Sequence, residues 1–181
     1  MNSRNTLNRR SFLKYTGSAG AFASFPALAA NTTQEKFLGF YHLHTGERLN
    51  IPYWAEGSYL PDTLAHINYL LRDFRAKETI TMDTTLLDAL HKLHTTLGSK
   101  KDFHVISGYR SPATNAKLMR QGRSVAKKSF HMKGQAIDVY LPDVSLKRLH
   151  RAAIDLNIGG IGYYRKSGFI HIDTGPVRRW G

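Results

Sequence analysis

The sequence contains no cysteine and only half as many acidic as basic residues. Its 181 residues include 13 aspartates and glutamates against 26 lysines and arginines, together with 9 histidines. The absence of cysteine excludes thiolate zinc sites, cysteine nucleophiles and disulfides, so histidine and carboxylate side chains must hold any metal. The shortage of acids leaves a formal charge of +13, which indicates an acidic partner.

The sequence also lacks a long apolar run after its N-terminal segment. No uninterrupted stretch of about 18 apolar residues occurs there, which argues against a polytopic membrane protein. The composition is that of a globular protein, with 41% hydrophobic and 22% charged residues. We therefore expect one soluble domain that is long enough to bury a core of its own.

The first 29 residues have the features of a twin-arginine signal peptide. Arg9 and Arg10 precede a mildly apolar segment rich in glycine and alanine, and Ala27-Leu-Ala resembles a signal-peptidase site. The alternative, an amphipathic helix of the mature protein, fits less well because the segment contains glycines and no acidic residue. The sequence therefore predicts a leader over 1–29, a mature domain over 30–181, and export to the periplasm by the twin-arginine machinery.

The mature domain keeps most of the positive charge. The leader carries four basic and no acidic residues, which leaves 22 basic against 13 acidic residues, or +9. Nucleic acid is a common partner for such a charge, but the predicted export to the cell envelope favours an anionic wall polymer or membrane surface. Once the leader is removed we expect no stable membrane insertion, whereas an uncleaved leader could act as an anchor.

Periodicity and capping residues predict alternating strands and helices along the mature domain. Two strand-like runs predict a hairpin in which His42 and His44 share one face, more consistent with a solvated face than with a metal site. The other predicted elements are a helix from Asp62 to Phe74 with Arg72, Arg75 and Lys77 near its C-terminal end, helices near 83–97, 113–120 and 145–156, and strands near 103–106, 135–141, 159–168 and 169–173.

Two histidines and an aspartate in the C-terminal half form a candidate metal site. Six residues separate His131 from Asp138, and His171 lies in a later strand-like run. Polar and apolar side chains alternate in both strands, so Asp138 and His171 each point away from the apolar face. Two histidines with one carboxylate are a common ligand set for catalytic zinc, and they leave a position for water. The alternative is that the three residues are unrelated in space.

A basic turn and a basic loop precede this candidate site. Arg110 lies in a strand-to-helix turn, a place where functional residues are common. Lys127 and Lys128 belong to the loop that leads into His131. This loop is either a solvated run of charges or a contact for an acidic substrate, and on the second interpretation both lysines are candidate substrate-binding residues.

The motifs around the candidate metal site together resemble those of one protein family. The pattern Ser129-x-His131-x-x-Gly134-x-Ala136-x-Asp138, followed by His171, resembles that of the M15 zinc peptidases, the D-Ala-D-Ala carboxypeptidase and murein endopeptidase group. The closing run from His171 to Trp180 and the twin-arginine leader are similar more narrowly to the exported MepK-type murein endopeptidases. The resemblance spans almost the whole mature chain. It implies a single α+β domain in which a small antiparallel sheet, flanked by helices, holds one Zn²⁺ ion.

The resemblance also implies roles for individual residues. His131, Asp138 and His171 match the zinc ligands of the family. Arg110 matches an arginine that contacts a substrate carboxylate or stabilises developing negative charge, a task that suits its bidentate guanidinium. Ser129 matches a site residue of the substrate-binding region whose role stays open.

One departure from the family pattern concerns the general base. Many members carry an acidic residue three positions before the last zinc histidine, where this sequence has Gly168. The nearest acid is Asp173, which shares a strand face with His171 and lies about 6.6 Å from it along the strand. We therefore predict that Asp173 is either the catalytic base or a residue that orients a ligating histidine.

The sequence thus predicts a zinc-dependent murein endopeptidase. Its substrates are expected to be peptidoglycan peptides rather than nucleic acid, with cleavage of 3-3 crosslinks between diaminopimelate residues, of 4-3 crosslinks between D-Ala and diaminopimelate, or of both. Two alternatives stay open. One is a D,D-carboxypeptidase that trims stem peptides, and the other is a non-catalytic peptidoglycan-binding module whose metal is structural or absent.

Overall fold

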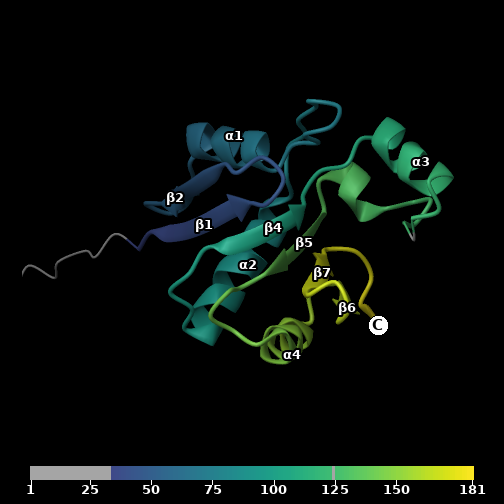
Figure 1. Ribbon diagram of the computed structural model, residues 1–181. Helices are drawn as coiled ribbons and strands as arrows, with labels where there is room; N and C mark the ends of the chain where they lie inside the picture. The colour runs from purple at the N-terminus through teal and green to yellow at the C-terminus, as the bar shows by residue number, and fades with distance from the viewer. Residues whose placement is uncertain (1–33, 124) are drawn as a thin grey trace, which may run out of the picture. The chain divides into compact units, whose positions relative to one another are not determined.

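The computed structural model describes residues 34–123 and 125–181, so the predicted leader lies outside the described residues. The described residues form one eight-stranded sheet with four α-helices and a short 3-10 helix, η1 (Figure 1). The strands are β1 (Lys36–His42), β2 (Arg48–Ala55), β3 (Ser58–Tyr59), β4 (Phe103–Ser107), β5 (Ala136–Tyr140), β6 (Gly160–Tyr164), β7 (Phe169–Asp173) and β8 (Arg178–Trp180). The helices are α1 (Pro61–Leu70), α2 (Thr84–Leu97), α3 (Pro112–Arg120), η1 (Phe130–Lys133) and α4 (Leu146–Leu156).

The strands of the sheet follow the order β3-β2-β1-β4-β5-β7-β6-β8. Neighbouring strands are antiparallel, except that β1 pairs with β4 and β6 pairs with β8 in parallel. This architecture confirms the predicted α+β class with a mostly antiparallel sheet. None of the helices in the described ranges is both long and apolar enough to cross a membrane.

The two faces of the sheet differ in chemistry. One face carries the buried side chains of Phe40, Val105 and Ile170, and the apolar sides of α2 and α4 complete the core with them. The other face carries Asp138 and His171, which are directly opposed in the β5–β7 register. Successive side chains of a strand alternate between faces, so one apolar core and one polar site share the same strands.

The first helix is shorter than predicted. α1 begins after its N-cap residue Leu60 and ends at Leu70. The carboxylate of Asp73 accepts hydrogen bonds from the backbone N–H groups of Arg75 (3.0 Å) and Ala76 (3.3 Å). Such local pairing competes with the hydrogen bonds of a continuing helix. As a result, Arg75 is presented by a loop and not by the end of a helix.

The prediction that His42 and His44 lie on a solvated face of the hairpin is wrong for His42. His42 is 1% exposed, because it continues the inward alternation of Leu38 and Phe40 along β1. Burial, together with the neighbouring His44, lowers the pKa of His42 to about 4. His44 lies beyond the strand and stacks on Phe74, with ring centroids 4.8 Å apart.

Candidate metal centre

Three of the predicted site residues meet on the polar face of the sheet. His131 comes from η1, Asp138 from β5 and His171 from β7. The separations are 3.2 Å between His131 Nε2 and His171 Nδ1, 2.8 Å between His171 Nδ1 and Asp138 Oδ1, and 3.3 Å between His131 Nε2 and Asp138 Oδ2. All three residues are buried. The tertiary structure therefore brings together side chains that are up to 40 positions apart in the sequence.

Local hydrogen bonds hold the turn that carries His131. Ser129 precedes η1, and its Oγ accepts a hydrogen bond from the His131 N–H (3.3 Å), as expected of an N-cap serine. Gly134 ends the turn with a φ of 67°, and a Cβ there would lie 2.6 Å from the carbonyl oxygen of Thr81. Ser129, a predicted substrate-binding residue, is thus buried and supports the position of His131.

The hydrogen bonds of the two imidazoles determine which nitrogens face each other. His131 Nδ1 lies 2.7 Å from the carbonyl oxygen of Gly108, and His171 Nε2 lies 2.8 Å from Asp173 Oδ2. Both partners accept hydrogen bonds, so these two nitrogens carry the ring protons. The other two nitrogens, His131 Nε2 and His171 Nδ1, then present lone pairs towards the carboxylate of Asp138.

Three hydrogen-bond acceptors converge at this point, and a cation stabilises such an arrangement. The ligand types and their number match catalytic zinc, and a tetrahedral ion with bonds of about 2.0–2.1 Å places its ligands about 3.3 Å apart. The observed separations of 2.8–3.3 Å are close to that value. Burial lowers the pKa of His171, but the carboxylates of Asp138 and Asp173 outweigh this effect and raise it. The residues therefore fit a zinc ion, and ligation itself stays a prediction.

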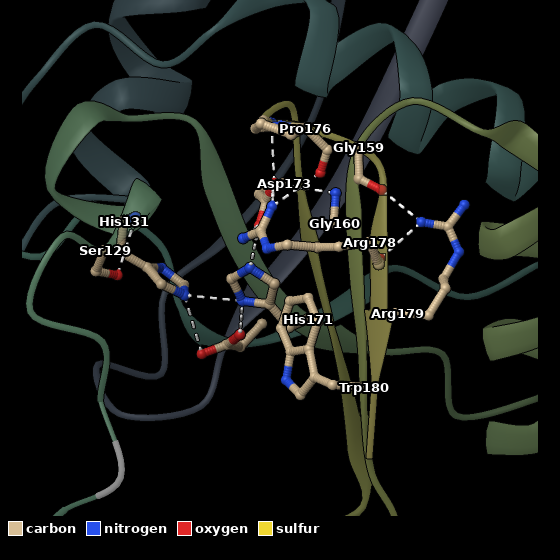
Figure 2. A network of polar contacts seen from close by, with 12 residues as sticks. Ser129, His131, Gly159, Gly160, His171, Asp173, Pro176, Arg178, Arg179 and Trp180 are labelled. Carbon is tan, nitrogen blue, oxygen red and sulfur yellow. Dashed lines mark hydrogen bonds and ion pairs between the residues drawn. The ribbon is translucent and has the colours of Figure 1, made fainter.

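Asp173 lies behind the imidazole of His171 and is surrounded by donors (Figure 2). Arg178 donates to both of its oxygens, at 3.0 Å to Oδ1 and 2.6 Å to Oδ2. The backbone N–H groups of Gly160 (3.0 Å) and Gly175 (2.9 Å) also donate to Oδ1. Burial raises the pKa of Asp173, but these donors outweigh it and lower the pKa to about 2. Of the two roles predicted for Asp173, this environment favours the orientation of His171 over proton transfer.

Two glycines on β6 allow the last strand to reach this site. A Cβ on Gly160 would lie 2.5 Å from Arg178 Nη1, and a Cβ on Gly162 would lie 2.5 Å from the ring of Trp180. Because both positions lack a side chain, Arg178 crosses β6 to the buried carboxylate, and the ring of Trp180 lies 5.2 Å from that of His171. The sequence motifs did not indicate Arg178 or Trp180 as site residues, although alternating glycines in a strand signal such a close approach.

The three candidate ligands lie in a basic cleft of about 520 Å³. Asp138 is the only carboxylate among the described residues that line it, whereas Lys128 is among its basic residues and Lys127 is not. The sequence therefore predicted only part of the basic lining, which consists of Arg75, Arg110, Arg123, Lys128 and Arg178.

Arg110 lies close to the candidate ligands, as its predicted role requires. Its Nη2 is 3.9 Å from Asp138 Oδ2, and its backbone N–H donates to the carbonyl oxygen of His131 (3.2 Å). The guanidinium also donates to Asn115 Oδ1 and to Ser107 Oγ, both at 3.3 Å. These contacts fix an arginine in the cleft that is 8% exposed and available to a substrate anion.

Comparison with known proteins identifies the family. Residues 30–180 match a family model described as Peptidoglycan L,D-endopeptidase MepK. The chain belongs to this family. The MepK proteins of Escherichia coli (strain K12) and Shigella flexneri are each 41% identical to the chain over 176 residues, which cover 96% of the chain and 97% of the relative. The probable MepK of Haemophilus influenzae is 40% identical over 177 residues, covering 96% and 95%. MepK-family membership confirms the resemblance seen in the sequence, and the matched range includes all the cleft residues described above.

Proposed function

We propose that this chain is a zinc-dependent murein endopeptidase that hydrolyses peptide crosslinks of peptidoglycan. The observation that carries the proposal is the convergence of His131 Nε2, His171 Nδ1 and the Asp138 carboxylate in a basic cleft. The relatives are named as peptidoglycan L,D-endopeptidases, which supports a scissile bond between an L-centre and a D-centre. The 3-3 crosslink between two diaminopimelate residues contains such a bond, and it is the substrate that we propose first.

The residues around the centre have separate tasks in this reaction. His131, Asp138 and His171 would hold the zinc ion, which would supply Lewis-acid polarisation of the scissile carbonyl and a lower pKa for water. Asp173 and the carbonyl oxygen of Gly108 hold the two imidazoles in the tautomers that ligation needs. Arg110 binds a substrate carboxylate or the negative charge that develops on the carbonyl oxygen.

The charge of the cleft matches that of the proposed substrate. Stem peptides of peptidoglycan carry free carboxylates, and a cleft lined by like charges attracts a substrate of opposite sign. Lys128 and Arg123 line the cleft from the segment between α3 and η1. Charges that are exposed in this way act mainly on the rate of encounter, whereas the buried Arg110 acts on the bound substrate.

The proposal is tested with purified crosslinked muropeptide dimers, 3-3 or 4-3 linked, whose products are identified by mass spectrometry. We expect the wild-type protein with zinc to convert 3-3 dimers to monomers, a chelator to stop the reaction, and added zinc to restore it. His131→Ala is expected to lose both bound zinc and cleavage. His66→Ala, which changes an exposed histidine of α1 outside the cleft, is the matched control and should retain both.

Each alternative function predicts a different result in this experiment. Dimers digested equally well by the His131→Ala protein would contradict the metal-site assignment. Release of terminal D-Ala from monomers, without cleavage of dimers, would identify a D,D-carboxypeptidase. Binding to murein sacculi without zinc and without any product would identify a peptidoglycan-binding module.

We also propose that the twin-arginine machinery exports the chain to the periplasm. The support is the Arg9-Arg10 pair and the segment that follows it, up to residue 29. Replacement of both arginines by lysine is expected to retain the protein in the cytoplasm, while Arg4→Lys, outside the pair, should leave export intact. Cell fractionation measures the outcome, and normal export of the twin-lysine variant would argue for another route.

A further inference from the structure

A loop beside the cleft brings a second arginine to the site of Arg110. Arg75 lies in the loop after α1 and lines the same cleft. Its guanidinium carbon lies 4.2 Å from the centroid of the Phe74 ring, and His44, which also lines the cleft, stacks on the same ring. Packing on an aromatic ring reduces the conformational freedom of a guanidinium group. The Phe74 ring therefore restrains the side chain of Arg75 at the wall of the cleft.

One buried carboxylate holds both arginine-bearing segments. Asp73 is 2% exposed, and its Oδ1 accepts a hydrogen bond from the N–H of Arg75 (3.0 Å). Its Oδ2 accepts a hydrogen bond from the N–H of Ser111 (2.9 Å), the residue that follows Arg110. The loop after α1 and the turn after β4 are therefore fixed relative to each other, although Asp73 and Ser111 are 38 positions apart.

The charge of Arg75 is not neutralised by the part of the chain that the structure describes. No carboxylate oxygen among the described residues lies within 4.0 Å of its guanidinium, whereas Arg178 pairs with Asp173. Arg75 and Arg110 both line the cleft, and the Asp73 carboxylate joins the two segments that carry them. Two cations that repel each other in one cleft favour the binding of an anion between them.

We propose that Arg75 and Arg110 together bind a free carboxylate of the crosslink peptide, and that Arg75 gives the enzyme its preference for substrates with this carboxylate. The inference rests on the function proposed above. In a crosslink, the diaminopimelate residue on the amine side of the scissile bond keeps a carboxylate on the carbon that bears the scissile nitrogen. Guanidinium groups bind carboxylates through paired charge-assisted hydrogen bonds. A carboxamide at this position carries no negative charge. Its NH₂ group would also place a hydrogen-bond donor opposite the N–H donors of the guanidinium groups.

The test uses two synthetic crosslinked peptides that differ only in this group, one with the free carboxylate and one with the carboxamide. For the carboxylate peptide, we expect Arg75→Gln to raise KM about tenfold, as for the loss of one charged hydrogen bond, with a smaller effect on kcat. For the carboxamide peptide, the KM values of the variant and the wild type should differ much less, because the group that Arg75 binds is absent. Arg75→Lys keeps the charge but not the paired donors, and its KM should lie between the two. Lys77→Gln removes a charge from the same loop outside the cleft and is the matched control.

The outcomes separate this inference from the proposed function. Wild-type protein that cleaves neither peptide refutes the proposed function and this inference with it. Cleavage of the carboxylate peptide that is unchanged in Arg75→Gln refutes this inference alone, as does an equal loss on both peptides. Thermal unfolding of each variant shows whether the fold is retained, and calorimetric titration of the carboxylate peptide into chelator-treated protein measures the same preference without turnover.

Discussion

The carboxylate of Asp173 lies directly behind His171, with Oδ2 2.8 Å from the Nε2 of the imidazole. This contact places the ring proton on Nε2 and leaves Nδ1, 2.8 Å from Asp138 Oδ1, as the candidate ligand atom. Arg178 from the last strand donates hydrogen bonds to both oxygens of the same carboxylate. A chain of contacts therefore runs from the C-terminal strand, through a buried acid, to the candidate metal site.

Asp173→Asn tests the orienting role of this acid. An asparagine of the same size loses the charge that pairs with Arg178 and weakens the hold on His171. We expect zinc affinity to fall about 10- to 100-fold, as for other residues that hydrogen-bond to ligands, and measure it by competition with a chelator. An exposed acid away from the cleft, Asp143→Asn, is the control. Loss of cleavage with unchanged zinc affinity would instead assign Asp173 as the base.

Gly162→Ala tests the close approach of the last strand. The new Cβ would lie 2.5 Å from the Trp180 ring, which also donates from Nε1 to the Tyr164 hydroxyl (3.1 Å). We expect a loss of about 1–3 kcal/mol in the free energy of unfolding, as for other overpacked sites, measured by urea denaturation. In a Trp180→Ala background the same substitution should cost much less. Additive losses would show that the ring and the glycine are not coupled.

Asp73→Asn tests the carboxylate that joins the loop after α1 to the turn after β4. Burial raises the pKa of Asp73, but hydrogen bonds, including that from the Ser111 N–H, outweigh it and lower the pKa. Because the folded pKa is the lower one, the stability that Asp73 contributes is complete above its unfolded pKa of about 3.9. This stability is then lost as the pH falls through the folded value.

The asparagine variant should therefore unfold more easily than the wild type near pH 7, by about 1–3 kcal/mol, since its NH₂ group faces an N–H donor. The difference should shrink as the pH falls below about 4, where the wild type loses the same contribution. Chemical denaturation of both proteins over this pH range measures the difference in their free energies of unfolding. A difference that is constant with pH would show that the charge of Asp73 is unimportant.

Ser129→Ala tests the cap of the turn that carries His131. Loss of the Oγ that accepts from the His131 N–H should cost about 1 kcal/mol of stability. Ser129→Thr keeps an acceptor at the same place and should retain most of the stability. Thermal unfolding distinguishes the two variants, and equal stability of the alanine and threonine proteins would contradict a capping role.

Local patterns were sufficient to predict much of the fold and the candidate ligands. Asp83 and Ser145 cap helices where their side chains predict it, and Gly98 ends α2 in the left-handed conformation. Strand alternation predicted that Asp138 and His171 leave the apolar face, because the side-chain period of a strand is two. Each of these features depends on a few neighbouring residues.

The helix after Asp62 shows where such patterns are insufficient. Its apolar spacing continues to Phe74, but the Asp73 carboxylate pairs with nearby N–H groups and with Ser111, so the chain turns into a loop after Leu70. Local hydrogen bonds of Asp73, together with a contact to a segment far along the chain, thus favour the loop over a longer helix. This contact also moves Arg75 from a helix end to the wall of the cleft.

The sequence by itself determined the types of candidate ligand, the absence of thiol chemistry and the faces of the strands, because these depend only on composition and on the two-residue period of a strand. Only the tertiary structure decided that Asp173 lies behind His171 with both oxygens engaged, and that Arg178 and Trp180 reach the site across Gly160 and Gly162. These relationships follow from the register of β7, β6 and β8, which is set by packing between distant segments.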